Sequence, residues 1–303
     1  MSVAELEAAE LSLESPTGGL WSEAWRQLIR NPAAIAGAVL VLMFVIAAIF
    51  APVIAPYGPL DQNLSLLKQG GIPPGPSLHH LLGVDLLGRD VFTRILYGAR
   101  FSLLIGVVSV SIGLAVGLVL GSIAGYIGGV LESVIMRCMD IMLAIPGLLF
   151  AIGIVALLGP GLYQIMVAIG VVNIPIFARL LRGSVLAQKE NDFVLAARAV
   201  GVKRRVILFS HILPNSISPV IVQGTLAMAT AIIDVAGLGF LGLGPQDPST
   251  PEWGTMLTDV NDYLQAAPFL AIIPGIAIVL SVLGFNLIGD GLREALDPKL
   301  RDR

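Results

Sequence analysis

One acidic residue, Asp234, lies inside a long apolar stretch of the sequence. A carboxylate in the interior of a membrane is costly unless it is paired, hydrated or protonated, so such a residue indicates a functional position. Counted from Ser216 at ~1.5 Å per residue, Asp234 lies roughly 27 Å along a helix, toward its outer end. We interpret it as a structural contact near an outer gate. A role in substrate passage and a role in proton coupling are the alternatives.

No other group predicts catalysis. The sequence has no GxxxxGK[ST] loop, so this chain is not expected to hydrolyse ATP. The GxGxxG spacing in residues 237–242 lies in an apolar stretch without a preceding strand, which favours a helix break or helix packing over a dinucleotide site. Adjacent His79 and His80 point apart, and Cys138 is the single cysteine. We therefore predict no enzyme activity, no cofactor, no metal site and no internal disulfide.

Composition places the chain in a membrane. It has 303 residues, of which 56% are hydrophobic and 13% are charged, and this balance excludes an ordinary soluble domain. The formal charge of −3 gives no reason to expect nucleic acid as a partner. The opening residues 1–16 are acidic and contain no lysine or arginine, unlike a signal peptide, so the first span is expected to remain as an anchor.

We predict an all-α integral membrane protein with six transmembrane helices, because each span needs about 20 apolar residues. Spans three and four share the charge-free run 141–177, which Gly159-Pro160-Gly161 divides, and Pro146 is expected to kink span three. The other spans are expected at 101–127, 216–246 and 268–289. The predicted segments are an N-terminal segment 1–32, a first helix 33–57, an extracytoplasmic loop 58–100, a five-helix core 101–290 and a tail 291–303.

Span two carries four glycines spaced by four residues, which are Gly113, Gly117, Gly121 and Gly125. Small residues at this spacing leave one helix face as bare backbone, where a second helix can approach closely. We predict helix packing for this face, with pore lining as the alternative.

Lysine and arginine placement predicts the orientation. Six spans put both termini on one side of the membrane. Basic residues lie on that side in the N-terminal segment, at Arg137, in the stretch 179–205 and in the tail. The positive-inside rule makes this side cytoplasmic. The loop 58–100 also carries basic residues, which we accept because long loops follow the rule poorly.

The stretch 189–215 is the long charged island between apolar spans, and we predict a helix, a break and a second helix there. Asp192 is expected to cap the first helix, Gly201 to end it, and Pro214 to close the unit. The small face of the first helix is formed by Ala196, Ala197 and Ala199. Two interpretations follow: the island lies on the lipid headgroups, or it docks in a groove of a soluble partner.

The island resembles a known loop. AARAVG followed by HILPN is similar to the cytoplasmic EAA loop of permease subunits from ATP-binding-cassette (ABC) importers, which docks on the ATPase subunit. Leu195 stands where that family usually has glutamate. The resemblance implies a coupling loop at 183–215, whose ATPase-coupling residues would be Asp192, Leu195, Ala196, Ala197, Arg198, Gly201, His211 and Pro214.

Three further motifs extend the resemblance. HLLGVDLLGRDVFTRILYGARFSL from His80, LGFLGLGPQDPSTPEWGTML from Leu238 and FNLIGDGLREALDPKLR from Phe285 are similar to the second, C-type permease of dipeptide and oligopeptide ABC importers. Nickel and glutathione importer permeases have similar chains. The resemblance implies a type I ABC importer permease fold, a multi-pass location in the bacterial cytoplasmic (inner) membrane, and both termini in the cytoplasm.

The resemblance also implies partners: a homologous second permease, two ABC ATPase subunits, an extracytoplasmic substrate-binding protein, a peptide substrate and membrane lipid. ATP-driven closure of the ATPases would push the island and tilt the spans to alternate access. The loops around Asp85–Arg94 and Gln246–Trp253 would face the binding protein. The alternative from another class is an ion-coupled secondary carrier that uses Asp234 as its coupling group.

Overall fold

The computed structural model describes residues 20–67, 71–258, 260 and 263–296. All long elements in these residues are helices, and the extended pairing within them is a single bridge between Val84 and Asp90. The longer helices are α2 (Leu20–Leu28), α3 (Pro32–Ile54), α4 (Val91–Ile127), α5 (Gly129–Leu143), α6 (Gly147–Leu158), α7 (Leu162–Lys189), α8 (Asp192–Ala199), α11 (Ser218–Leu238) and α12 (Phe269–Leu296). The short helical segments are η1 (Leu64–Leu66), α9 (Arg204–Val206), η2 (Ile207–Ile212), α10 (Leu213–Ser216), η3 (Gly239–Leu243) and η4 (Thr255–Leu257).

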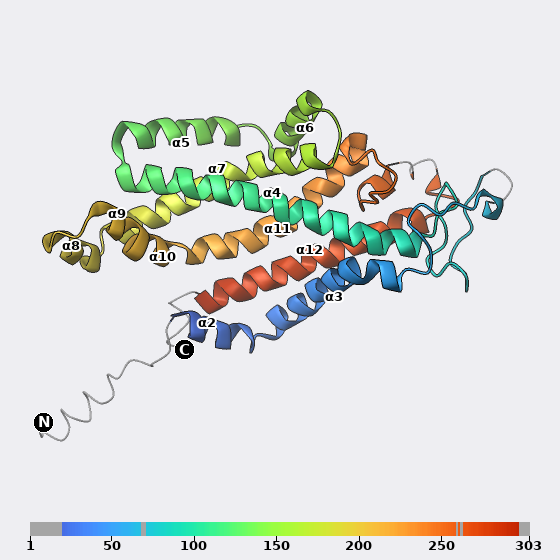
Figure 1. Cartoon of the computed structure of the whole chain (residues 1–303), viewed down its shortest axis with the longest axis horizontal. Coiled ribbons are helices and arrows are strands. Elements are labelled where there is room, and N and C mark those ends of the chain that lie inside the picture. The colour runs from blue at the N-terminus through green and yellow to red at the C-terminus, as the bar shows by residue number, and fades with distance from the viewer. Residues whose placement is uncertain (1–19, 68–70, 259, 261–262, 297–303) are drawn as a thin grey trace, which may run out of the picture.

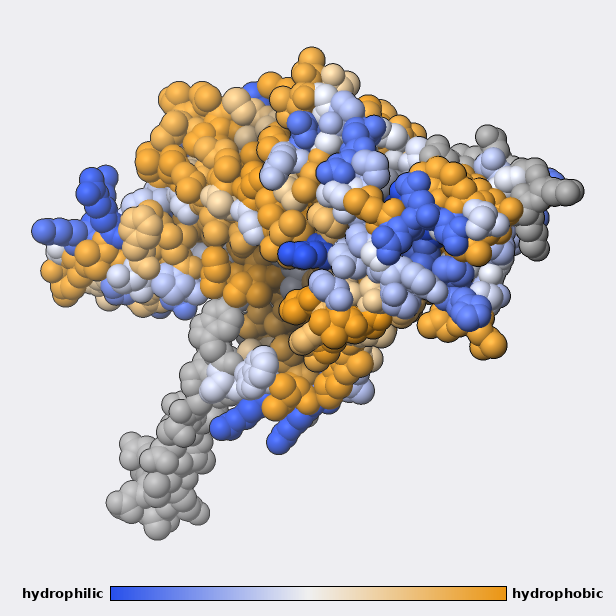
Figure 2. All heavy atoms as spheres, turned by 45° about the vertical axis from the view of Figure 1, so that its right-hand side comes forward, coloured by the Kyte–Doolittle hydropathy of each residue, from blue (hydrophilic) through white to orange (hydrophobic). Residues whose placement is uncertain are grey.

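Five helices are long and apolar enough to cross a membrane, and α5 with α6 forms a sixth candidate that is bent by 91°. The five are α3, α4, α7, α11 and α12. Large apolar side chains such as Val39, Ile49 and Val53 on α3 are exposed. Figure 2 shows apolar residues spread widely over the surface, with hydrophilic residues gathered where the loops come forward. The all-α membrane fold is therefore confirmed.

The long helices run along one axis (Figure 1). α4 packs along α7, α3 packs along α12, and α11 lies between these pairs. The described loop residues 55–67, 71–90, 244–258, 260 and 263–268 lie at one end, which we call the loop end. The segment 189–217, α2 and the last turns of α12 lie toward the other end, which we call the island end. The largest group of buried apolar residues is shared by α4, α6, α7, α11 and the island.

Helix α4 begins at Val91 and not at Phe101 as predicted. Asp90 is its N-cap, and one carboxylate oxygen accepts a 2.7 Å hydrogen bond from the Thr93 backbone N–H. The prediction stopped at the charged residues Arg94 and Arg100, although both lie within the helix. Residues 91–100, which the prediction assigned to the loop 58–100, therefore form the first turns of α4.

The third span also differs from the prediction. Residues 129–143, expected as a polar link followed by apolar helix, form the continuous helix α5, which a break at Pro146 separates from α6. Proline lacks a backbone N–H and clashes with the preceding turn, so the helix breaks there, and α5 and α6 meet at an angle of 91°. Glu132 and Asp140 on α5 pair with Arg182 and Arg179 on α7.

Helix α12 continues to Leu296, beyond the predicted end of span six at 289 and of the core at 290. Gly291, placed in the tail by prediction, is buried against Ala34 of α3. Asn31, the N-cap of α3, donates a 2.7 Å hydrogen bond from its side chain to Glu294. The charged residues of this last turn belong to the helix because α2 and the start of α3 pack against it. Residues 297–303 lie outside the described part.

Candidate functional site

The island folds as a helix, a glycine turn and an irregular second helix. α8 spans Asp192–Ala199, and Asn191 occupies the N-cap in extended conformation, so the predicted cap at Asp192 is wrong by one residue. Asp192 lies instead in the first turn, where a carboxylate interacts favourably with the helix dipole. Gly201 follows the helix with φ +77°, and its N–H donates to the Arg198 carbonyl at 3.0 Å. A left-handed glycine here ends the helix, as the sequence predicts.

The second half of the island runs through α9 (Arg204–Val206), a π-helical stretch η2 (Ile207–Ile212) and α10 (Leu213–Ser216). Pro214 lies inside α10 rather than at the end of the unit. Because proline donates no backbone hydrogen bond, the turn before it widens to the π-helical pattern. His211 lies in this wide turn, half-buried, and its carbonyl accepts a 2.6 Å hydrogen bond from the Asn215 side chain.

The two faces of α8 have different surroundings. Val194 and Ala197 are buried in the main apolar core together with Ile207 and Ile212 of η2. The side chain of Ala197, which is 8% exposed, therefore supports the fold, and its expected role in coupling to the ATPase stays a prediction.

The opposite face of α8 is open. Leu195 is 49% exposed, and Phe193, Ala196, Arg198 and Val200 are also exposed around the rest of the helix, together with the charged Asp192. We call Phe193, Leu195, Ala196, Arg198 and Val200 the outer face of α8. An exposed apolar helix face of this kind suits a groove on another protein.

Two hydrogen bonds tie the island to the long helices. Tyr126, in the last turn of α4, donates from its hydroxyl to the Arg204 carbonyl at 2.8 Å. Lys189, the last residue of α7, donates from Nζ to the Tyr126 carbonyl at 3.2 Å. The island is therefore hydrogen-bonded to the end of α4, which is in turn hydrogen-bonded to the end of α7.

The glycines of α4 lie against α7. A Cβ added to Gly113 would lie 2.6 Å from the Asn173 Cβ, and one added to Gly117 would lie 2.6 Å from the Phe177 Cβ. A Cβ added to Gly121 would lie 2.6 Å from the Ala178 carbonyl oxygen, and one added to Gly125 would lie 2.9 Å from the Val185 Cβ. These glycines let α4 and α7 pack backbone to backbone. The face is buried, so the structure gives it packing geometry rather than a pore surface.

Asp234 lies on α11, one turn before the helix ends at Leu238. Its side chain is half-buried, and it has no hydrogen-bond or ion-pair partner in the described part of the chain. Beyond it, the residues 239–243 form a π-helical turn, η3, in which Gly242 has φ +77°. The GxGxxG spacing thus marks a helix break. Asp234 lies toward the loop end, away from the island.

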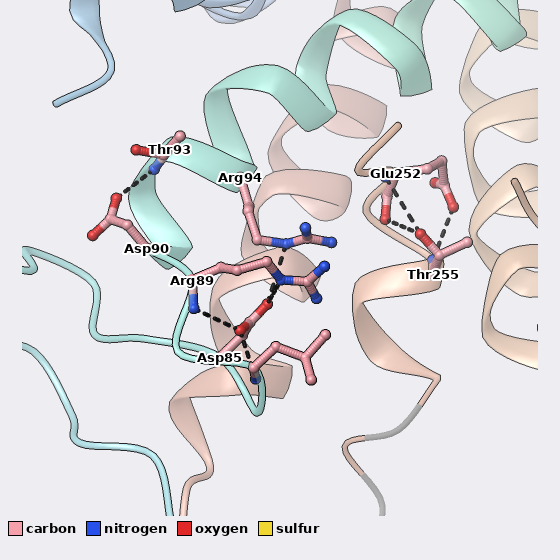
Figure 3. A network of polar contacts seen from close by, with 8 residues as sticks. Asp85, Arg89, Asp90, Thr93, Arg94, Glu252 and Thr255 are labelled. Atoms are coloured by element: carbon pink, nitrogen blue, oxygen red, sulfur yellow. Dashed lines mark hydrogen bonds and ion pairs between the residues drawn. The ribbon is translucent and has the colours of Figure 1, made fainter. Parts of the chain in front are cut away.

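The loop end contains a charged network within Asp85–Arg94, the segment expected to face the binding protein (Figure 3). Asp85 accepts a 2.6 Å bond from Arg89 Nε, and Arg94 Nε lies 3.4 Å from the same carboxylate oxygen. Asp90, besides capping α4, is 3.0 Å from His80 Nδ1. Asp90 and Arg94 are buried, so the segment Asp85–Arg94 is only partly available to another protein.

The neighbouring segment 252–255 is also internal. Trp253 is fully buried, donates from Nε1 to the Ile95 carbonyl at 3.2 Å, and packs edge-on against Phe44. The Glu252 carboxylate accepts hydrogen bonds from the N–H groups of Gly254 and Thr255 at 2.8 and 2.9 Å. The prediction that residues 246–253 form a docking surface is therefore wrong for Glu252 and Trp253, which are buried.

Burial raises the pKa of Glu252 to about 7, although its three hydrogen-bond donors, which include the Ser102 hydroxyl, act in the opposite direction. Sequence reasoning missed this buried acid because it treated the proline-rich loop as solvated. The sequence signal that could have indicated a buried segment here is the large apolar Trp253 followed by Gly254. A Cβ at Gly254 would lie 2.4 Å from the Ala236 carbonyl oxygen, so this glycine lets the loop enter between the helices.

Comparisons with known proteins agree with this geometry. Residues 117–302 match the family described as the binding-protein-dependent transport system inner membrane component. Residues 19–74 match the N-terminal TM domain of oligopeptide transport permease C. The chain resembles solved structures of the MetNI methionine ABC transporter in inward-facing conformations. One match has a TM-score of 0.57 at 19% identity and covers 67% of this chain and 97% of the other, which shows a shared fold.

Sequence relatives match over almost the whole length. The dipeptide transport system permease protein DppC of Alkalihalophilus pseudofirmus is 50% identical over 281 residues, covering 93% of this chain and 90% of the relative. The di/tripeptide transport system permease protein DppC of Pseudomonas aeruginosa is 47% identical, with 92% of each chain covered. The glutathione transport system permease protein GsiD of Shigella flexneri is 48% identical, with 93% and 91% covered. This chain therefore belongs to the family of binding-protein-dependent transport system inner membrane components.

Proposed function

We propose that this chain is the C-type permease subunit of an ABC importer for dipeptides or short oligopeptides. It forms half of a translocation pore with a homologous permease and receives cargo from an extracytoplasmic binding protein. Two ATPase subunits hydrolyse ATP, and the chain itself has no catalytic role. The dipeptide and di/tripeptide permeases at 50% and 47% identity support this cargo class. Family membership favours an importer over the ion-coupled carrier.

The observation that carries the coupling role is the outer face of α8. It presents Leu195 and Phe193 to the outside, while the inner face of the same helix is anchored in the core through Val194 and Ala197. Tyr126 and Lys189 join this unit to α4 and α7. Force applied to the outer face by an ATPase would therefore move the island as one body and tilt the long helices.

The proposed orientation places the island end in the cytoplasm and the loop end outside. Arg198, Lys203 and Arg205 of the island, with Arg293 of α12, support this placement through the positive-inside rule. In this orientation Asp234 lies near the outer end of the pore, in agreement with an outer-gate role. Its lack of a partner in the described residues is compatible with contact to the second permease.

Cysteine crosslinking in membranes tests the coupling role. Exposed Cys138 is replaced by Ser, and a single cysteine is introduced at Leu195 or, as a matched control, at Ala197 in the same helix. Both variants are coexpressed with the second permease, the ATPases and the binding protein. We expect Leu195→Cys to crosslink to the ATPase in a manner that changes with ATP, and the buried Ala197→Cys to crosslink weakly. A Leu195→Cys variant that inserts and assembles without crosslinking would contradict the docking role.

Cargo is tested by uptake into cells that lack other peptide importers. We expect the assembled importer to take up a labelled dipeptide and to be inhibited by unlabelled dipeptide. Glutathione is the second candidate, because the GsiD permease is 48% identical. Uptake of glutathione or of nickel ions in preference to dipeptide would overturn the peptide assignment while leaving the ABC importer assignment intact.

A further inference from the structure

A cavity of about 160 Å³ lies at the loop end, between the turn before α4 and the segment that follows Trp253. Its lining combines charged side chains, which include Asp85, Arg89 and Arg94, with apolar ones, which include Met256 and Leu270. The cavity is remote from the island and takes no part in the proposed contact with the ATPase. In the orientation proposed above for this chain, the cavity lies on the outer side of the membrane.

Positively charged side chains outnumber negatively charged ones among the described residues around this cavity. The two oxygens of Asp85 accept the backbone N–H groups of Leu87 and Arg89, both at 2.9 Å, and the Nε of Arg89 at 2.6 Å. Arg94 reaches the same carboxylate only with Nε at 3.4 Å. Two guanidinium groups thus share one carboxylate whose acceptor positions are largely taken by other donors. Among the described residues that line the cavity, Arg89 and Arg94 against Asp85 leave a surplus of one positive charge.

Arg94 is the group that this arrangement leaves incomplete. The residue is 6% exposed, and its Nη1 is buried without any hydrogen-bond partner in the described part of the chain. The other buried side-chain atoms there without a partner are the hydroxyl oxygens of Thr93 and Ser109. A charged donor costs more than a hydroxyl when it is buried and unpaired. Figure 3 shows the guanidinium of Arg94 directed away from Asp90 and toward the side on which Thr255 lies.

We propose that this cavity binds a single carboxylate group, held by the guanidinium of Arg94 and neutralised by Arg94 together with Arg89. Carboxylates match the planar fork of a guanidinium and form charge-assisted hydrogen bonds with it. Met256 and Leu270 provide an apolar wall for the carbon chain that bears the group. A cavity of ~150 Å³ holds a molecule of about the size of benzene. The site therefore accepts the end of a chain, such as a peptide terminus or one acidic side chain.

The test uses the assembled importer in nanodiscs and propionate as the probe. The thermal unfolding midpoint is measured against propionate, with chloride keeping the ionic strength constant, and against the neutral isostere propionamide. We expect a saturable rise with propionate only. The rise should disappear in Arg94→Met and persist in Arg100→Met, an exposed arginine on the same helix. No rise in the wild-type protein, or an equal rise in Arg94→Met or with propionamide, would overturn the proposal.

If Arg94→Met does not assemble, Arg94→Lys replaces it. This variant keeps the positive charge and loses the fork, so we expect the propionate concentration at half-maximal effect to rise at least tenfold. An unchanged concentration would contradict recognition by the guanidinium.

A second arm identifies the source of the carboxylate. A rise in the unfolding midpoint with a free dipeptide, and none with the same dipeptide amide, assigns the carboxylate to the cargo. If propionate acts and neither peptide does, and Arg94→Met weakens crosslinking to the binding protein, the carboxylate belongs to an acidic side chain of that protein. The propionate result is independent of the cargo proposal, since it holds whatever compound the importer carries.

Discussion

The hydroxyl of Tyr126, at the end of α4, donates a 2.8 Å hydrogen bond to the backbone carbonyl of Arg204, in the island. The carbonyl of the same tyrosine accepts from Lys189 at the end of α7. Tyr126 is thus the point at which the island, α4 and α7 meet. In the proposed coupling role, this junction would connect the island to both long helices.

Replacing Tyr126 with Phe should weaken this junction without emptying the space that the ring fills. A hydrogen bond of this kind contributes about 1 kcal/mol, so the folded state should persist while the island moves more independently. We expect peptide uptake to fall several-fold while ATP hydrolysis by the assembled complex is retained. Tyr163→Phe, at an exposed tyrosine of α7, is the control and should transport normally. Equal ratios of transport to hydrolysis in both variants would show that the bond is not part of the coupling path.

The close approach of α4 to α7 predicts that Gly117→Ala destabilises the chain. The new Cβ would lie 2.6 Å from the Phe177 Cβ and 3.0 Å from backbone atoms of Ile174 and Ala178, so the helices must separate. Overpacking of this kind costs about 1–3 kcal/mol. We expect a lower thermal unfolding midpoint in detergent.

The matched control for that substitution is Gly153→Ala on α6. No atom lies within 4 Å of a Cβ built there, and alanine favours a helix over glycine by about 1 kcal/mol. This variant should be neutral or slightly more stable. The two alanine substitutions should therefore have opposite signs, and a similar effect of both would argue against the packing interpretation of the glycine stripe.

The buried acid Glu252 predicts a pH dependence of stability. Its pKa is raised from 4.5 to about 7 in the folded chain, because burial disfavours the charged form. A group with a raised folded pKa contributes its full stabilisation below its unfolded pKa of 4.5. That contribution is lost as the pH rises through the folded pKa of about 7. We therefore expect the unfolding midpoint to fall between pH 5 and pH 7.5.

Glu252→Gln should remove this part of the pH dependence, since the amide does not titrate. The comparison is between slopes of the unfolding midpoint against pH, because the amide also changes the hydrogen bonds to Gly254 and Thr255. Glu190→Gln, at an exposed acid of the island end, should keep the slope of the wild-type protein. A slope that survives in Glu252→Gln would assign the pH dependence to another group.

Most of the fold follows from local sequence signals. Apolar length identifies the spans, and Gly201 identifies the end of α8, because each signal acts through the residues next to it. The start of α4 at Val91 was missed because a charged residue near a span is judged by composition, whereas Asp85 and Asp90 provide the partner and the cap. The 91° bend at Pro146 depends on how α6 packs on α7, which no local pattern encodes.

The candidate site was predictable to a similar extent. The location of the island between two spans could be read from its charge, but the division of α8 into inner and outer faces could not. Alanine fits either face, so the burial of Ala197 and the exposure of Ala196 are decided by the contact with η2. Trp253 likewise packs against Gly98, a residue far away in the sequence. Neither residue taken by itself predicts this contact.

The turn at Gly201 provides the last prediction, which concerns coupling rather than stability. Its φ of +77° is incompatible with proline, which also lacks the N–H that donates to Arg198. Gly201→Pro should therefore distort the end of α8 and abolish uptake, while insertion and assembly continue because no span is altered. Gly71→Pro is the control, since Gly71 has φ +73° in an equally open loop at the opposite end. We expect that control to retain most of the uptake. Normal uptake by Gly201→Pro would exclude the island as the lever, and loss in both variants would point to a general effect of proline in loops.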